Sequence, residues 1–472
     1  MDSKYGKSDK QVYPEDRNME FLKLDKKVYI PTCDKDGNTT WGEMTAVTRH
    51  DPGERLYKVK TLSGRNVTVA ESKSLLIWDD YKKEFQGKFT PDVKIGDYVP
   101  VTVNLQEPPV LSEYFDMTEY FPKTEYIYGT EFNKATKYMT EAMIDRIKIP
   151  QGWWKTNNGK TFITPYTKKS SLTRMLSGRS NTENIKDGYI YPYHASRDSC
   201  LIPDKFELNK ENGIFIGLYL AEGSSHDYSG KVSIANIDTD VKLFVKKWFD
   251  KHNITNKEYT KQMKIGITEN IGTSTSIQGS STILARFLDK FVGHGAHNKF
   301  VPSIAFTAPE EFIIGILNGY IAGDGSVGNS GITTTSASYK LTEGIAMLCS
   351  RLGIFGNMSI RKNKTKNLAY DKTYADSHVL TIRSKWAKIM SEKVDCVLVA
   401  KNTKLKQLSC SKKHINYPDH NNVVLDKITK IEIIDVSDNP KLYDVTVPST
   451  ENFQISNGIN VYDTLISGVE KQ

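Results

Sequence analysis

The sequence predicts an α+β protein in which one domain is inserted into another. Short strand-like segments occupy residues 21–104 and 420–464, whereas helical and strand-like patterns alternate over residues 208–415. An all-β piece interrupted by an α/β piece is typical of a nested domain. The α/β piece contains an internal repeat, so we expect two similar halves. The remaining segments are a polar tail at 1–20, an irregular, aromatic and basic region at 105–207, and a tail at 465–472.

The length and composition restrict the class of protein. A chain of 472 residues is too long for a single core. Its mean hydropathy is −0.48, no apolar run is long enough to span a bilayer, and residues 1–20 lack the apolar core of a signal peptide. We therefore expect a cytoplasmic protein with no membrane partner, made in a host cell. A phage or another mobile element is the source that we consider, and the organism stays open.

The five cysteines do not form a recognisable pattern. They are spread along the chain, their number is odd, and no Cys-x-x-Cys pair occurs. A zinc site built from Cys396, Cys410 and His414 would have an uncommon ligand spacing. Reduced, mostly buried thiols are the preferred interpretation.

The two terminal pieces are expected to form strands. In the first piece the strand patterns are followed by a turn signal at Ser63-Gly64 and by the segment 94–101. The expected strands are residues 28–30, 56–60, 67–69 and 75–78 in the first piece, and 431–434 and 443–447 in the second.

The internal repeat consists of two apolar segments that each end in an acid and a glycine. Residues 216–223 read IGLYLAEG and residues 318–325 read NGYIAGDG, which places Glu222 and Asp324 102 residues apart. A strand pattern follows each segment, at residues 231–235 and 331–335. An amphipathic helix follows each strand, with its apolar residues at helical spacing; these residues are Val241, Phe244, Val245, Trp248 and Phe249 in the first copy, and Leu341, Ile345, Leu348 and Leu352 in the second.

Small residues share one face of each repeated helix. Gly217 and Ala221 are four residues apart, as are Gly319 and Gly323. Glycine costs about 1 kcal/mol of helix propensity relative to alanine, so this spacing indicates that two helices pack closely along these faces. The glycine that follows each acid is a good helix stop.

Close packing of these helices would bring Glu222 and Asp324 side by side. A carboxylate at a helix C-terminus faces the negative end of the dipole, and two like charges at short range need a counter-charge. Mg²⁺ suits carboxylate and carbonyl oxygens and takes only one or two protein carboxylates. Such a site suits hydrolysis of a phosphodiester. The alternative is a pair of buried helices with capping acids.

The two segments resemble the paired LAGLIDADG motifs of homing endonucleases, with Glu222 where aspartate is commoner. The resemblance implies a pseudo-two-fold monomer of two αββαββα-like halves, in which the carbonyls of Ala221 and Gly323 also face the metal ions. It also implies a basic residue in each half that supports the metal-bound water. Lys299 follows Glu222 by 77 residues and Lys404 follows Asp324 by 80, and these are the chosen residues. Lys401 is the rival for the second position.

Two basic segments are expected to contact DNA. Residues 146–179 carry eight basic residues and no acid, a charge equal to the net +8 of the whole chain. Local positive charge beside a neutral body indicates a polyanion contact, although a solvated loop is the alternative. The run at 361–366 is expected to meet phosphates, and the resemblance implies that the strands of each half form a saddle over the major groove. The candidate DNA-binding residues are Lys155, Lys160, Lys168, Lys169, Arg174, Arg361, Lys362 and Lys364.

The flanking β pieces resemble the two halves of an intein splicing domain, the Hint fold. Residues 94–99 are similar to a Hint turn, and residues 441–447, 452–453 and 457–461 are similar to the C-terminal region of an intein. Ala70 and Lys73 stand where the resemblance implies Thr and His, and Tyr462-Asp463 replaces the terminal His-Asn pair. Aspartate does not cyclise as asparagine does, and lysine is a poor proton shuttle near neutral pH.

The sequence therefore predicts a Mg²⁺-dependent, site-specific DNA endonuclease derived from an intein that no longer splices. Its expected partner is double-stranded DNA with a long recognition site, and it is expected to act as a monomer. Two alternatives remain: a DNA-binding protein with an inactive nuclease fold, and an intein that still splices itself. Retention of both acids argues against the first, and the replaced splicing residues argue against the second.

Overall fold

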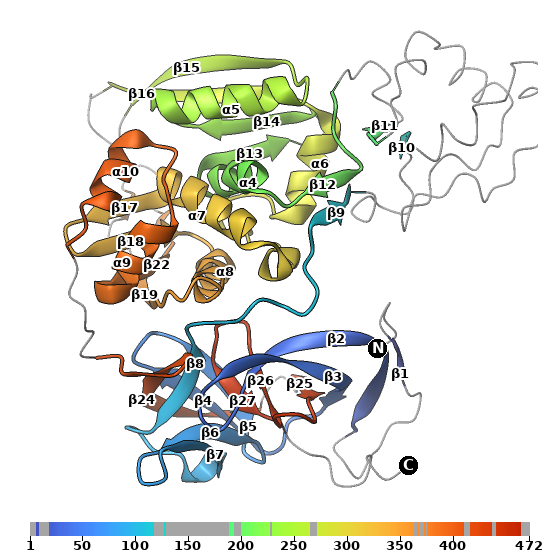
Figure 1. The fold of residues 1–472 in the computed structure, drawn as a ribbon, viewed down its shortest axis with the longest axis vertical. Coiled ribbons are helices and arrows are strands. Elements are labelled where there is room, and N and C mark those ends of the chain that lie inside the picture. The colour runs from blue at the N-terminus through green and yellow to red at the C-terminus, as the bar shows by residue number, and fades with distance from the viewer. Residues whose placement is uncertain are drawn as a thin grey trace, which may run out of the picture.

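The computed structural model describes residues 6–8, 18–117, 127–128, 188–192, 200–226, 229–264, 271–362, 366–367, 372–373, 375–409, 416–436 and 440–463. These residues form two bodies, an all-β body and an α/β body (Figure 1). None of the helices in these ranges has the length and apolar character that a membrane crossing requires.

The all-β body is built from both terminal pieces of the chain. Every strand that the sequence predicted in these pieces is present. The strands that were not anticipated are β1, β3 and β7 toward the N-terminus and β23, β26 and β27 toward the C-terminus. The strands are β1 (Gly6–Ser8), β2 (Glu20–Cys33), β3 (Thr39–His50), β4 (Arg55–Thr61), β5 (Asn66–Ala70), β6 (Ser74–Asp79), β7 (Glu84–Phe89), β8 (Tyr98–Thr102), β23 (Asp419–His420), β24 (Val423–Asp435), β25 (Leu442–Thr446), β26 (Asn452–Gln454) and β27 (Asn460–Tyr462), with a 3-10 turn at Thr90–Asp92.

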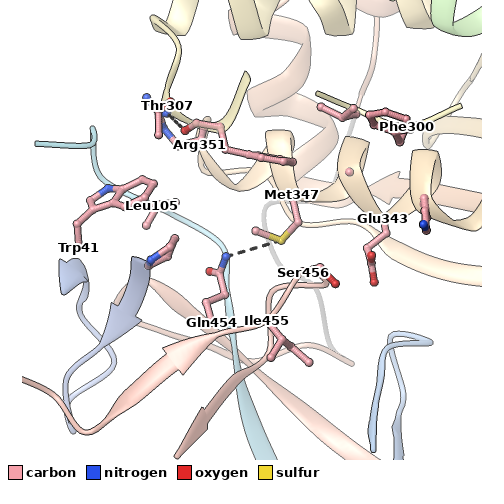
Figure 2. Close-up of a pocket in the computed structure, with 15 residues that line it drawn as sticks. Trp41, Leu105, Phe300, Thr307, Glu343, Met347, Arg351, Gln454, Ile455 and Ser456 are labelled. Atoms are coloured by element: carbon pink, nitrogen blue, oxygen red, sulfur yellow. Dashed lines mark hydrogen bonds between the residues drawn. The ribbon is translucent and has the colours of Figure 1, made fainter. Parts of the chain in front are cut away.

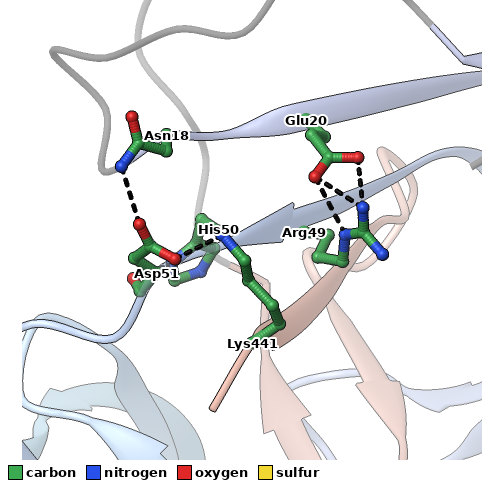
Figure 3. A network of polar contacts seen from close by, with 6 residues as sticks. All are labelled: Asn18, Glu20, Arg49, His50, Asp51 and Lys441. Atoms are coloured by element: carbon green, nitrogen blue, oxygen red, sulfur yellow. Dashed lines mark hydrogen bonds and ion pairs between the residues drawn. The ribbon is translucent and has the colours of Figure 1, made fainter. Parts of the chain in front are cut away.

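The two ends of the chain interleave within this body. Strand β24 pairs with β4 and β8, and β25 pairs with β3, always antiparallel. Polar contacts join the same segments, as Figure 3 shows: Arg49 of β3 binds both carboxylate oxygens of Glu20 on β2. Asp51, just after β3, accepts hydrogen bonds from Asn18 at 2.7 Å and from Lys441, just before β25. The second body is thus inserted between segments that pair with each other.

The α/β body consists of two halves with the same order of elements, helix-strand-strand-helix-strand-strand-helix, which extends the two similar halves that the repeat predicted. The first half is α4 (Lys210–Glu222), β13 (Gly223–His226), β14 (Lys231–Ala235), α5 (Thr239–Lys251), β15 (Asn256–Lys264), β16 (Ile271–Ser280) and α6 (Thr282–Phe291). The second half is α7 (Glu310–Asp324), β17 (Gly325–Gly328), β18 (Gly331–Ser336), α8 (Tyr339–Ser350), β19 (Asn357–Arg361), β22 (Ser377–Arg383) and α9 (Ser384–Lys393).

Each half has a four-stranded antiparallel sheet with the same strand order, β13-β14-β16-β15 and β17-β18-β22-β19. Val232 and Ile234 of β14 are buried, whereas Lys231 and Ser233 on the other face are not. One face of each sheet therefore carries the core, and the other presents polar side chains.

Smaller elements complete this body and its connections. They are β9 (Tyr114–Asp116), which pairs with β12 (Lys205–Glu207), β10 (Ile127–Tyr128), which pairs with β11 (Tyr191–Pro192), β20 (Lys366–Asn367), which pairs with β21 (Lys372–Thr373), the 3-10 helix η6 (Ser303–Thr307) and α10 (Val399–Lys406).

The apolar faces predicted for the two amphipathic helices form part of the core. On α5 the side chains of Val241, Val245, Trp248 and Phe249 are at most 1% exposed, and Phe244 is partly buried against them. The predicted residues of α8, together with Leu352 just beyond it, are also buried. Burial of one stripe of each helix explains why helical periodicity located both elements.

A buried arginine joins the two bodies at the tip of the β4–β5 hairpin. Arg65 is 2% exposed, donates hydrogen bonds to Asn457 O at 2.7 Å and Gly356 O at 3.0 Å, and lies 4.7 Å from the centre of the Phe355 ring. The adjacent Gly64 has φ +81°, and a Cβ there would lie 1.8 Å from Met358 O. The predicted turn thus fits against the second half of the α/β body, which only glycine permits.

Candidate active site

Helices α4 and α7 approach each other closely enough that their backbones touch. A Cβ added to Gly217 would lie 2.1 Å from Ile316 O, and one added to Gly319 would lie 2.2 Å from Ile214 O. These clashes are reciprocal, as expected for two halves related by a pseudo-two-fold axis. The predicted small-residue faces therefore do pack together.

A further pair of glycines extends this contact toward the start of each helix. Cβ atoms on Gly213 and Gly315 would lie 2.4 Å and 2.3 Å from backbone carbonyl oxygens of the opposite helix. This pair was not among the residues predicted from the sequence, although it continues the spacing of four residues.

The predicted acids end the two helices and lie beside each other. Glu222 is the last residue of α4 and Asp324 the last of α7. A Cβ on Gly323 would lie 2.4 Å from Ala221 Cβ and 3.2 Å from Glu222 Cγ. Glu222 is exposed and Asp324 is partly buried. The side chain of Glu222 thus lies beside the residue that precedes Asp324, at the end of the close contact between α4 and α7, and its charge acts on Asp324.

The glycines after the acids directly follow the helix ends, as expected, but neither adopts the left-handed conformation that is common at such a position. Gly223 has φ −82° and Gly325 has φ −78°, because each helix leads directly into an extended strand. Glycine is needed there for space, since a Cβ would lie 2.5 Å from Tyr219 O or from Ile321 O.

A lysine caps the end of each helix. Lys299 Nζ donates hydrogen bonds to the carbonyl oxygens of Tyr219 (2.7 Å), Leu220 (3.1 Å) and Gly223 (2.8 Å). Its side chain is 5% exposed. A cation at this position binds carbonyl groups at the C-terminus of the helix and opposes the negative end of the dipole.

Lys401 is the counterpart of Lys299 in the second half. Its Nζ donates to the carbonyl oxygens of Ile321 (3.1 Å), Ala322 (2.7 Å) and Gly323 (2.9 Å). It follows Asp324 by 77 residues, the same interval that separates Lys299 from Glu222. The structure therefore places Lys401, and not the chosen Lys404, behind the acid pair. Lys404 is an exposed residue of the same short helix, α10.

The four charged groups affect one another. Burial and the charge of Glu222 raise the pKa of Asp324 from its ordinary 3.8 to about 7, although Lys299 and Lys401 oppose the rise. Burial lowers the pKa of Lys299 to about 8 and also lowers that of Lys401, against the pull of both acids. Perturbed groups that gather at one point are typical of a functional site.

The donor set fits a hard divalent cation. Two carboxylates with an unfavourable mutual charge lie next to backbone carbonyls, which is the ligand chemistry that Mg²⁺ prefers. The carbonyl of Gly323 accepts a hydrogen bond from Lys401, but a carbonyl oxygen has a second lone pair. Among the described residues no cluster of three or more His, Cys, Asp or Glu side chains could hold a metal ion.

The predicted DNA-binding residues are only partly described. Lys155, Lys160, Lys168, Lys169, Arg174 and Lys364 lie outside the described residues. Arg361 ends β19, where it pairs with Ser377 on the face that also carries Thr381 and Asn357. Arg361 and Lys362 are both exposed, so both can reach a ligand on the polar face of the second sheet.

The positions compared with splicing residues gather in the all-β body. Ala70 ends β5, and Lys73 follows it with its Nζ 2.7 Å from both carboxylate oxygens of Asp444 on β25. Asp463 is 2% exposed, and its carboxylate accepts a hydrogen bond from Val447 N at 3.0 Å. Tyr462 donates to Glu451 at 2.7 Å. The replaced residues are therefore held by contacts of their own.

The described cysteines agree with the expectation of reduced, buried thiols. Cys33, Cys200, Cys349 and Cys396 are buried, and none of these four forms a disulfide. Burial raises the pKa of the Cys33 thiol to about 12, which suppresses its reactivity. Cys410 and His414, which were considered as zinc ligands, lie outside the described residues.

Comparison with known proteins identifies a family for nearly the whole chain. A family model described as "Intein splicing domain" matches residues 13–462. The DNA-directed RNA polymerase subunit Rpo1C of Methanocaldococcus jannaschii is 28% identical over 400 residues, covering 84% of this chain and 36% of that protein. A DNA polymerase of Thermococcus hydrothermalis is 26% identical over 260 residues, covering 53% of this chain and 15% of that protein. The chain thus spans little more than a third of the first relative's length.

Two solved structures show weaker likenesses. The crystal structure of I-DmoI in complex with DNA and Ca has a TM-score of 0.31 and 13% identity, covering 42% of this chain and 98% of that one. The TvoVMA intein has a TM-score of 0.18 and 16% identity, covering 21% and 54%. Both scores are too low to establish a shared fold.

Proposed function

Because the chain belongs to the intein splicing domain family, we propose that it is an intein-derived homing endonuclease of the LAGLIDADG type that cuts double-stranded DNA and no longer splices. The observation that carries the nuclease function is the arrangement at the ends of α4 and α7. There Glu222 and Asp324 lie side by side, each half supplying a lysine at the same interval of 77 residues.

The proposed roles follow from the contacts of these residues. Glu222 and Asp324 would hold Mg²⁺ together with the carbonyls of Ala221 and Gly323. A bound Mg²⁺ supplies an activated water and neutralises the charge on the scissile phosphate. Lys299 and Lys401 hold the two helix ends in place and present positive charge next to the acids. Their lowered pKa values make them better able to exchange protons near neutral pH.

The polar faces of the two sheets are the proposed DNA-binding surface. In the first half Lys231, Lys257 and Lys261 share the face opposite the buried Val232 and Ile234 of β14. In the second half Arg361 and Arg383 occupy the corresponding face. Basic side chains contact phosphates, and neighbouring polar side chains can read base edges in the major groove. A monomer with two such sheets would cover a long, nearly symmetric site.

Loss of splicing is proposed from the replaced residues. The ammonium of Lys73 is held by Asp444 in a pair whose side chains are 12% and 9% exposed. A cation fixed in this way is a poor substitute for a histidine that must shuttle a proton. Asp463 cannot form the cyclic imide of asparagine, and its carboxylate is already bound to the backbone.

The nuclease proposal is tested by cleavage of a random DNA library, followed by sequencing of the cut ends. We expect Mg²⁺-dependent cutting at one long site by the natural protein. Glu222→Gln and Asp324→Asn should each abolish cleavage while DNA binding persists in a gel-shift assay. Undiminished cutting by either variant would exclude the proposed mechanism, and binding without cutting by the natural protein would indicate an inactive nuclease fold.

The loss of splicing is tested separately, by mass spectrometry of the purified full-length chain after long incubation with and without a thiol. We expect a single unchanged mass. A fragment or ligated product generated at the bond between residues 463 and 464 would show that splicing chemistry survives, without affecting the nuclease proposal.

A further inference from the structure

A cavity lies at the junction of the two bodies, away from the paired acids. Its volume is about 570 Å³, within the range of roughly 300–1,000 Å³ that is typical of small-molecule sites. Figure 2 shows that its wall combines residues of the all-β body with residues of α8. The apolar part of the wall is formed by Trp41, Leu105, Phe300, Val301, Met347 and Ile455.

Two polar side chains in this wall lack a hydrogen-bond partner on one atom. Arg351 is 7% exposed and Gln454 is 8% exposed. The Nε of Arg351 is a donor without an acceptor, and the Oε1 of Gln454 is an acceptor without a donor. A buried polar group without a partner costs about 1–3 kcal/mol, and more when it is charged. Both groups therefore favour an occupant that supplies the missing partner.

The charges of the wall favour an anion. Arg351 donates to the carbonyl of Phe306 and makes no ion pair among the described residues, although Glu107 and Glu310 act on it from a greater distance. Lys340 adds a second, exposed cation. The acid in the wall, Glu343, is occupied by hydrogen bonds with Ser456 and Tyr339. The wall thus has a net positive charge and one buried cation without a carboxylate.

We propose that this junction cavity is a binding site for a small amphipathic organic anion. Its apolar body would lie between Trp41, Met347 and Ile455, its anionic group would accept from Arg351, and a hydroxyl or N–H group would donate to Gln454. Because the wall comes from both bodies, the occupant would bind them together. Phe300 follows Lys299 directly in the chain, so the site lies next to a residue that caps α4.

The test uses two fluorescent probes that share a body and differ in charge. 8-Anilinonaphthalene-1-sulfonate has an aromatic body, a sulfonate and an N–H donor, whereas N-phenyl-1-naphthylamine lacks the sulfonate. We expect the sulfonate probe to bind the full-length chain with a stoichiometry of one and at least tenfold more tightly than the neutral probe. Equal affinities, or binding of several probe molecules, would overturn the proposal.

Variants locate the site. Arg351→Met keeps an apolar stem and should remove most of the tenfold preference for the sulfonate probe, while binding of the neutral probe persists. Gln454→Leu should lower the affinity for the sulfonate probe several-fold. The control is Arg55→Met, which removes an exposed arginine outside both the cavity wall and the proposed DNA-binding surface and should leave both affinities unchanged.

Circular dichroism of each variant and a co-crystal structure provide the remaining checks. Each variant is compared with the natural protein by circular dichroism, so that a loss of binding is not confused with unfolding. If Arg351→Met fails to fold, a co-crystal structure of the natural protein with the sulfonate probe decides the matter. Density for the probe against Arg351 and Gln454 supports the proposal, and density elsewhere refutes it.

Discussion

Replacing Asp324 with asparagine should stabilise the protein while it destroys the proposed activity. The pKa of this carboxyl is raised from 3.8 to about 7, chiefly by burial and then by the charge of Glu222. A rise of about three pH units corresponds to about 4 kcal/mol, at 1.36 kcal/mol for each unit. Because the side chain is only partly buried and solvent screens its charge, we expect Asp324→Asn to gain about 2–4 kcal/mol at pH 8.

The sign of this effect depends on pH. Since the folded pKa lies above the unfolded one, the folded state binds more protons between pH 4 and pH 7, and its stability falls as the pH rises through that window. Asparagine does not ionise. The advantage of Asp324→Asn should therefore be small near pH 4, grow up to about pH 7 and remain constant above it.

The assay is urea unfolding of the full-length chain in EDTA, at several pH values. Circular dichroism at 222 nm is the signal, because the α-helices among the described residues lie in the α/β body. Glu311→Gln is the matched control: it removes the same charge from the first turn of the same helix, where an acid is favourable, and should cost about 0.3–1 kcal/mol. An Asp324→Asn variant whose stability gain does not change with pH would refute the reasoning.

Three further predictions concern the same helices. Lys401→Met should lower the cleavage rate at least a hundredfold, the effect of losing a preorganised charged donor, whereas Lys404→Met should leave the rate within twofold in the same assay. Gly319→Ala should lower the free energy of urea unfolding by about 3 kcal/mol, because its methyl group would lie 2.2 Å from a carbonyl oxygen. The control is Gly328→Ala, where the nearest atom is 3.9 Å away; this variant should change the free energy of unfolding by less than about 0.5 kcal/mol. Mg²⁺ at about 100 times its dissociation constant should stabilise the natural protein by about 2.7 kcal/mol, and it should not stabilise the Asp324→Asn variant. Equal stabilisation of both proteins would show that the acid pair is not the metal site.

The paired helices were predictable because their constraints are local. Glycine is costly in a helix, so small residues repeated four apart, as Gly217 with Ala221 and Gly319 with Gly323, indicate a tight contact between two helices. The acids that follow were placed by the same pattern. Periodicity also located α5 and α8, since each buries one continuous stripe. The long strand β3 was missed because its residues show no simple alternation of burial.

The second lysine was not predictable from local sequence. Helix α10 contains Lys401, Lys404 and Lys406 within six residues, and the direction of each side chain depends on how the helix packs. The choice of Lys404 relied on an approximate match of intervals. The interval of 102 residues between the two acids, applied to Lys299, gives Lys401. Internal symmetry therefore contained information that the local pattern lacked.

The hairpin tip at Arg65 has a consequence for any attempt to isolate the nuclease as a fragment. Excision of the α/β body would expose the ring of Phe355 to water and deprive the carbonyl of Gly356 and the N–H of Met358 of the partners that residues 63–65 provide. In the β body, Arg65, whose charge acts on the buried Asp426, would lose its acceptor Gly356 O and its contact with the Phe355 ring. The two bodies are therefore not independent domains. An isolated nuclease fragment would need new side chains in place of the contacts that residues 63–65 make, before it could fold without the β body.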